Sequence, residues 1–132
     1  MIRRGEIYWV NLDPTVGSEI KKTRPGLVVS NDLNNLHGQT VTVLPVTSNM
    51  TKVHPFEVLL PARLCGLKED SKAKADQVRT VDKRRLGKLV GFAPAEVMKE
   101  ADAALRLHLD LEPPPQELLH DGPRYYLKKA VA

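Results

Sequence analysis

The sequence predicts a small, mainly β domain of the α+β type, namely a β-barrel with short helices and one helix near the C-terminus. Several short segments rich in β-branched and other apolar residues are separated by proline, glycine or asparagine, which is the pattern of strands joined by turns. Apolar residues at helical spacing follow these segments, late in the chain. Many short strands with one terminal helix are typical of a compact barrel.

The expected strands are short, and two of them contain an irregularity. They cover residues 6–12, 26–30, 40–46, 56–60, 71–81 and 89–92. Pro45 cannot donate a hydrogen bond to a ladder, so we expect it at a sheet edge or a bulge. In segment 71–81 the apolar residues change phase midway, which predicts a bulge near Asp76 or Gln77.

Two helical segments are expected. Residues 31–36 are predicted to form a short helical turn that Asn31 or Asp32 caps. The main helix begins near Pro94, because proline is favoured in a first turn. Three consecutive prolines, residues 113–115, are expected to end it.

Length and charge suit one small domain with a polyanionic or acidic partner. The chain has 132 residues, enough for a single core, and a formal net charge of +4. Its cations include two clusters of a kind that binds nucleic acid or acidic proteins: Lys21, Lys22 and Arg24, and Lys83, Arg84 and Arg85. The single cysteine, Cys65, stands among leucines and excludes a disulfide within the chain, so we expect a buried, inert thiol.

The sequence also argues against several classes of protein. No apolar run approaches the roughly 20 residues that span a membrane, and the N-terminus lacks a signal-peptide pattern. We therefore expect a cytoplasmic protein that does not associate with membranes. There is neither a metal-ligand spacing nor a glycine-rich phosphate loop, so we expect no metal and no cofactor.

The step Arg24-Pro25-Gly26 joins a polar, basic loop to an apolar strand. Pro25 biases Arg24 toward extended backbone, and Gly26 allows another backbone or a ligand to approach closely. A guanidinium rooted in this way is suited to bind a phosphate group.

Five segments together resemble the MazF/PemK family of toxin endoribonucleases. They are residues 4–14, 17–30, 44–48, 54–58 and 75–82, in the family's order and at compatible spacings. The resemblance runs from residue 2 to about residue 111 and implies an SH3-like barrel over residues 1–111. Residues 112–132 have no counterpart in the family. They read as a proline-rich linker and a C-terminal tail, which either docks back on the barrel or is a disordered or vector-derived end.

The resemblance implies that Arg24 and Thr47 are catalytic. A guanidinium is a poor base at neutral pH, because its pKa lies above roughly 12, so we take Glu19 in the same loop as the candidate base. A catalytic histidine, His37 or His54, remains a less favoured alternative. RNA contacts are expected from eight polar side chains around these residues: Asn11, Ser18, Lys21, Lys22, Thr23, Ser48, Gln77 and Arg79.

The function implied is that of a type II toxin, a metal-independent, sequence-selective endoribonuclease. Attack by the RNA's own 2′-hydroxyl would leave 2′,3′-cyclic phosphate and 5′-hydroxyl ends of single-stranded mRNA. The resemblance further implies a homodimer, controlled by an acidic MazE-like antitoxin and touching DNA only indirectly, through the antitoxin complex. Two alternatives stay open at this stage: a CcdB-like gyrase-binding toxin without nuclease activity, and an inactive binding module.

Overall fold

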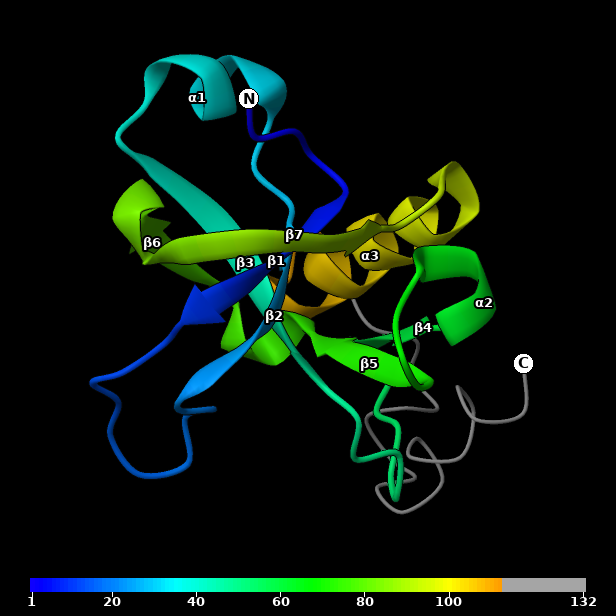
Figure 1. Ribbon diagram of the computed structural model, residues 1–132. Helices are drawn as coiled ribbons and strands as arrows, with labels where there is room; N and C mark the ends of the chain where they lie inside the picture. The colour runs from blue at the N-terminus through cyan, green and yellow to red at the C-terminus, as the bar shows by residue number, and fades with distance from the viewer. Residues whose placement is uncertain (113–132) are drawn as a thin grey trace.

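A computed structural model describes residues 1–112, and within them seven strands form one antiparallel sheet (Figure 1). The strands are β1 (Glu6–Asn11), β2 (Thr23–Val28), β3 (Thr40–Thr47), β4 (Glu57–Leu60), β5 (Ser71–Lys74), β6 (Arg79–Asp82) and β7 (Leu86–Phe92). The helices are α1 (Asp32–His37), α2 (Ala62–Cys65) and α3 (Ala95–His108), with 3₁₀ turns η1 (Ala75–Gln77) and η2 (Lys83–Arg85).

The strand order explains why the sheet curves into a barrel. The path runs β4-β5-β3-β2-β1-β7, and β6 pairs with β3 beside β5. β6 and β7 are neighbours in the chain, separated by the three residues of η2, yet they lie on opposite sides of the β1–β2–β3 set. A connection this short can bridge those edges only if the sheet bends around. The mainly β, barrel-like fold predicted from the sequence is thus confirmed.

The sheet buries apolar side chains on both faces. Leu27 and Val28 are adjacent in β2 and fully buried, but they belong to different cores. Leu27 packs in the larger core beneath α3, whereas Val28 packs in a second core with Val41, Val43 and Val81. Since successive side chains of a strand point to opposite faces, the continuous apolar run of β2 is what a two-sided burial requires.

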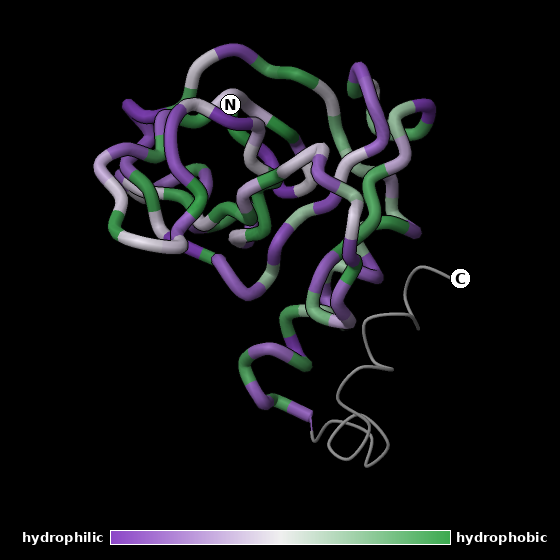
Figure 2. The backbone as a smooth tube through the Cα atoms, turned by 90° about the horizontal axis from the view of Figure 1, so that it is seen from below, coloured by the Kyte–Doolittle hydropathy of each residue, from purple (hydrophilic) through white to green (hydrophobic). Residues whose placement is uncertain are grey.

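The helix α3 covers one face of the sheet, against β4 and η1 (Figure 1). Its buried residues are Val97, Met98, Ala101 and Ala104. Along this helix hydrophobic and hydrophilic residues are interspersed (Figure 2), and the buried ones recur at the spacing of an amphipathic helix. In α1, Asn31 caps the helix by accepting a hydrogen bond from the Asn34 N–H at 2.8 Å. No helix within residues 1–112 is long and apolar enough to cross a membrane.

Two strand details differ from the sequence prediction. Segment 71–81 is two strands, β5 and β6, separated by η1 where a bulge was expected. Both strands pair with β3, but with different stretches of it, so the change of phase marks a change of pairing site. The prediction that Pro45 lies at a sheet edge is wrong, because β3 is central. Pro45 lies between the residues of β3 that pair with β6 and those that pair with β5, so no N–H donor is needed on that side of the strand.

The helix ends also differ from expectation. The helix α3 ends at His108, before the prolines, and Asp110 has a left-handed φ of 58°. The helix α2 was not predicted from the sequence. Gly66, which ends it in the left-handed conformation with φ of 75°, is the kind of residue that commonly follows a helix. Cys65 is buried as expected, and burial raises the pKa of its thiol. Apart from Glu112, the tail predicted for residues 112–132 lies outside the described residues.

The end of α2 approaches the backbone of β7 closely, which generates a stability prediction. A Cβ at Gly91 would lie 2.0 Å from the carbonyl oxygen of Cys65. Because main chain must then shift, we expect Gly91→Ala to lower the free energy of unfolding by about 1–3 kcal/mol, measured by urea denaturation. Gly87→Ala in the same strand is the control, since its Cβ would meet nothing nearer than 3.6 Å. Equal stability of the two variants would contradict the proposed close contact.

Candidate functional site

The pairing of β2 with β3 brings the start of β2, which carries Arg24, toward the end of β3, which carries Thr47. Gly26 stands opposite Pro45 at the last paired position, and the same antiparallel register, continued by two residues, would bring Arg24 opposite Thr47. Arg24 is half-buried, and its Nε donates to the Lys21 carbonyl at 3.4 Å. A guanidinium carries five N–H donors, so most of this group's capacity remains for an anionic ligand.

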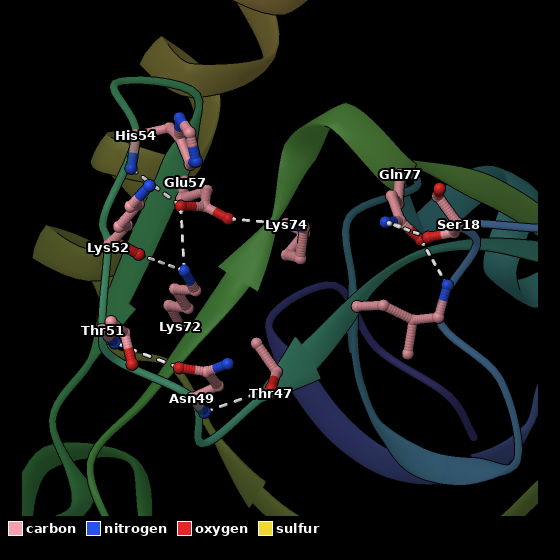
Figure 3. Close-up of polar contacts among 11 residues, drawn as sticks. Ser18, Thr47, Asn49, Thr51, Lys52, His54, Glu57, Lys72, Lys74 and Gln77 are labelled. Atoms are coloured by element: carbon pink, nitrogen blue, oxygen red, sulfur yellow. Dashed lines mark hydrogen bonds and ion pairs between the residues drawn. The ribbon is translucent and has the colours of Figure 1, made fainter. Parts of the chain in front are cut away.

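The Thr47 hydroxyl is oriented by the turn that follows it. Its Oγ1 accepts a hydrogen bond from the Asn49 N–H at 3.1 Å, and the Asn49 Oδ1 accepts one from the Thr51 N–H at 3.1 Å (Figure 3). Because the oxygen is the acceptor in this contact, the hydroxyl proton is available to donate to another group. Thr47 is therefore set up as a hydrogen-bond donor.

A pocket of about 660 Å³ opens beside Arg24. Its wall is built from the start of β2, the end of β3, the segment after α2, and β7. Thr47 lies between two lining residues, Val46 and Ser48. The pocket thus gathers four predicted site residues in one place and has a fifth, Thr47, at its edge. The four are Lys22, Thr23, Arg24 and Ser48.

Several lining residues were not anticipated from the sequence, among them Trp9, Lys68, Glu69 and Lys88. With Lys22 and Arg24, the two lysines give the pocket four cations, against the one carboxylate of Glu69, beside the aromatic surface of Trp9. Lys68 follows α2, a helix that was not expected, and Lys88 lies in β7 ahead of its predicted start. Their closeness to Arg24 depends on how distant strands pair, and no local sequence signal carries that information.

The other predicted residues lie along the β1–β2 loop, outside the lining of this pocket. Gln77 holds the loop with both ends of its amide: Oε1 accepts from the Ile20 N–H at 2.6 Å, and Nε2 donates to the Ser18 carbonyl at 3.3 Å (Figure 3). Arg79 donates to the Leu12 carbonyl at 3.2 Å. In this structure Gln77 and Arg79 therefore fix the loop.

Within the same loop, Glu19 closes a turn. Its Oε1 accepts from the Val16 N–H at 2.5 Å, which leaves the carboxylate exposed but not directed into the pocket. Lys21 and Asn11 are exposed as well. Lys22 adopts a left-handed φ of 71°, and its N–H donates to Asp13 Oδ1 at 3.0 Å. The loop is thus also shaped by hydrogen bonds from its own N–H groups to its own carboxylates.

The second basic cluster makes contacts inside the chain. The Lys83 ammonium donates to the Asn35 carbonyl at 2.6 Å, and Arg84 pairs with Asp82 at 3.0 Å. Arg85 donates to the Asn11 carbonyl at 3.1 Å and also to that of Asp13. These cations help to hold η2 and the β1–β2 loop, so the basic loop near Arg24 is the better candidate for binding an acidic ligand.

Neither candidate histidine lines the pocket. His37 is exposed at the end of α1. His54 stacks on Phe56, with ring centroids 4.9 Å apart, and burial lowers its pKa. Their surroundings give no support to the histidine alternative.

The segments that build this site lie within the part of the chain that matches a known protein family. A family model for the PemK-like, MazF-like toxin of type II toxin–antitoxin systems matches residues 3–109. The chain belongs to this family. The match covers the whole barrel, including both strands that carry Arg24 and Thr47.

Individual MazF/PemK relatives agree in sequence and in fold. The endoribonuclease MazF9 of Mycobacterium tuberculosis is 49% identical over 116 residues, which cover 84% of this chain and 98% of the relative. The crystal structure of MazF from Deinococcus radiodurans superposes with a TM-score of 0.73 at 34% identity, over 83% of this chain and 96% of that one. A MazE–MazF crystal structure from the same organism matches at 31% identity and TM-score 0.65, over 84% and 98%.

The contacts of Gln77 generate a prediction about the β1–β2 loop. We expect Gln77→Ala to leave the fold intact but to speed hydrogen exchange of the Ile20 amide by about fivefold, because one hydrogen bond of roughly 1 kcal/mol is lost. Gln39→Ala, at an exposed position, is the control. Unchanged protection of the Ile20 amide would mean that Gln77 does not hold the loop in solution.

Proposed function

We propose that this chain is the toxin of a type II toxin–antitoxin system and that it cleaves single-stranded RNA. The observation that carries the proposal is the placement of Arg24 and Thr47 at one cationic pocket, in a chain of the MazF/PemK family. The name of its relative MazF9, an endoribonuclease at 49% identity, supports the same activity.

RNA can be cut without an external nucleophile, because its 2′-hydroxyl attacks the neighbouring phosphorus. The P–O5′ bond then breaks and the leaving 5′-oxygen takes up a proton from water, which leaves a 2′,3′-cyclic phosphate on one product and a 5′-hydroxyl on the other. In our proposal Arg24 stabilises the charge that develops on the phosphoryl oxygens, and Thr47 donates a hydrogen bond to the same group. Glu19 is the proposed acceptor of the 2′-hydroxyl proton, reaching the substrate as the β1–β2 loop closes on it.

The remaining polar residues are proposed to bind the RNA on either side of the scissile phosphate. Lys22, Thr23 and Ser48 line the pocket and offer donors to backbone phosphates. A second group lies along the β1–β2 loop and β6 and is proposed to set the sequence preference: Asn11, Ser18, Lys21, Gln77 and Arg79. Gln77 and Arg79 would do so chiefly through the loop that they hold.

The gyrase-binding alternative is not favoured. A toxin that only docks on a protein needs no phosphate-binding arginine beside a hydroxyl donor. MazF9 of Mycobacterium tuberculosis, to which the chain is 49% identical, is named an endoribonuclease.

An acidic antitoxin is the proposed partner. The MazE–MazF crystal structure of Deinococcus radiodurans is a precedent for such a complex in the family. We further propose a homodimer in the cytoplasm, with DNA contacted only through the antitoxin complex. The exposed apolar side chains Trp9, Leu89 and Phe92, on paired strands β1 and β7, provide a surface that a second copy would cover. Because Trp9 and Leu89 also line the pocket, that second copy would border the proposed RNA site.

The proposed chemistry predicts the ends of the products. We expect the purified protein to cut single-stranded RNA in excess EDTA, leaving 2′,3′-cyclic phosphate and 5′-hydroxyl termini, identified by mass spectrometry. The reason is that the nucleophile belongs to the substrate and the stabilising charges belong to the protein. An absolute requirement for magnesium, or products with 5′-phosphates, would refute the proposal.

Arg24 and Thr47, two of the proposed catalytic residues, should contribute unequally to kcat. Arg24→Ala removes a charged stabiliser and is expected to lower kcat by a factor of about 10² to 10³. Thr47→Ala removes one neutral donor and is expected to cost about tenfold. Arg106→Ala on α3, which breaks a surface pair with Glu112, is the control and should cleave normally. Near-normal cleavage by Arg24→Ala, in a folded protein, would contradict its assignment.

The basic loop predicts a shared site for RNA and antitoxin. Reversing both charges, Lys21→Glu with Lys22→Glu, should weaken binding of RNA and of the co-expressed acidic antitoxin. Both interactions should also weaken as salt rises, because exposed charges are screened within about 10 Å at 0.1 M salt. Fluorescence anisotropy at two salt concentrations measures this. Loss of RNA binding with antitoxin affinity unchanged would show that the antitoxin docks elsewhere.

A further inference from the structure

A buried cluster of charges lies just beyond the β3–β4 loop, on strands β4 and β5. Glu57 is fully buried, and Lys72 beside it is 6% exposed. The Lys72 Nζ lies 3.1 Å from Glu57 Oε1, and the Lys74 Nζ lies 3.2 Å from Glu57 Oε2 (Figure 3). Charged side chains are rarely buried to this extent unless they are paired.

Both members of the pair Glu57–Lys72 also hold the main chain of the loop that follows Thr47. Lys72 donates a hydrogen bond to the Lys52 carbonyl, and Glu57 Oε1 accepts one from the His54 N–H at 2.7 Å. Burial alone would raise the pKa of Glu57. The His54 N–H and the two lysines outweigh that effect and lower it, so the carboxylate stays ionised and continues to accept these bonds.

The held loop is the one that orients the Thr47 hydroxyl. From Lys52 the chain runs back through Thr51 and Asn49, whose N–H groups make the successive turn contacts that end on Thr47 Oγ1. Thr47 and Lys72 are also direct partners in the β3–β5 ladder. The cluster therefore acts on both sides of the turn: beneath Thr47 through the sheet, and beyond it through Lys52 and His54.

We propose that Glu57 and Lys72 are positioning residues for the Thr47 hydroxyl. This inference rests on the proposed function, in which Thr47 donates to the scissile phosphate. A buried ion pair is weak evidence of a stabilising role, since apolar residues of similar volume often serve stability as well or better. What apolar residues cannot do is hold the Lys52 carbonyl and the His54 N–H in place.

The test compares two lysines on one carboxylate. Lys72→Met removes the contact with the Lys52 carbonyl, whereas Lys74→Met removes only the ion pair with Glu57 Oε2. We expect Lys72→Met to lower kcat for RNA cleavage about tenfold with little change in KM, because a misplaced donor costs rate rather than binding. Lys74→Met should change kcat by less than about twofold. Equal losses in the two variants would overturn the proposal.

A double-mutant cycle shows whether the effect passes through Thr47. In the Thr47→Ala background, Lys72→Met should cause no further loss of kcat, since the group that it positions is already absent. If the two losses multiply, Lys72 acts by another route and the inference is wrong. Cleavage by the unmodified protein is measured first. If it does not cut RNA, the proposed function fails, which is a different outcome from full activity of Lys72→Met.

A second variant covers the case in which Lys72→Met does not fold. Glu57→Leu combined with Lys72→Met removes both charges and keeps the volume, so it should melt close to the unmodified protein or above it. We expect this protein to be folded, to lose at least about tenfold in kcat, and to show faster hydrogen exchange at the Asn49 amide. A folded double variant with full kcat would refute the positioning role.

Discussion

Gly26 stands opposite Pro45 in the β2–β3 ladder, and this pairing marks the register on which both cores and the candidate site depend. A slip of one residue would exchange the faces of Leu27 and Val28, which fill different cores. The same slip would turn Arg24 away from Thr47. A Cβ at Gly26 would lie 2.8 Å from Val10 Cγ2, so any larger residue here would force the buried Val10 side chain to shift. The packing that stabilises the fold and the geometry of the site therefore depend on a single register.

The segment from β5 to η2 supplies several of the contacts that hold the site's loops. Lys72 holds the loop after Thr47, and Gln77, Arg79 and Arg85 hold the loop before Arg24. Figure 3 shows the end of β3 lying between two of these groups of contacts. Neither loop has a helix or sheet of its own, so this polar scaffold does for the loops what the apolar cores do for the strands.

The sequence was sufficient for the barrel, its late helix and the cluster around Arg24, because each depends on local patterns. Pro45 shows the limit: its missing donor was correctly expected to avoid a ladder bond, but the gap that accommodates it arises from β5 and β6 sharing one neighbour. Lys68 and Lys88 could not be assigned to the pocket for the same reason. The roles of Gln77 and Glu57 were hidden because a single side chain's partners are set by long-range packing.

The tip of the β1–β2 loop, at Val16 and Gly17, stands clear of the barrel. Val16 is 81% exposed, and the turn closes on itself through Glu19. Within residues 1–112, nothing except the chain neighbours of Gly17 lies within 4 Å of the position where a Cβ on Gly17 would stand. Substitutions at Val16 thus cost the barrel little, while a side chain there projects beyond the anchored stem. Related proteins could therefore vary the residues at this tip, and with them the ligand contacts that the tip makes, without a loss of fold stability.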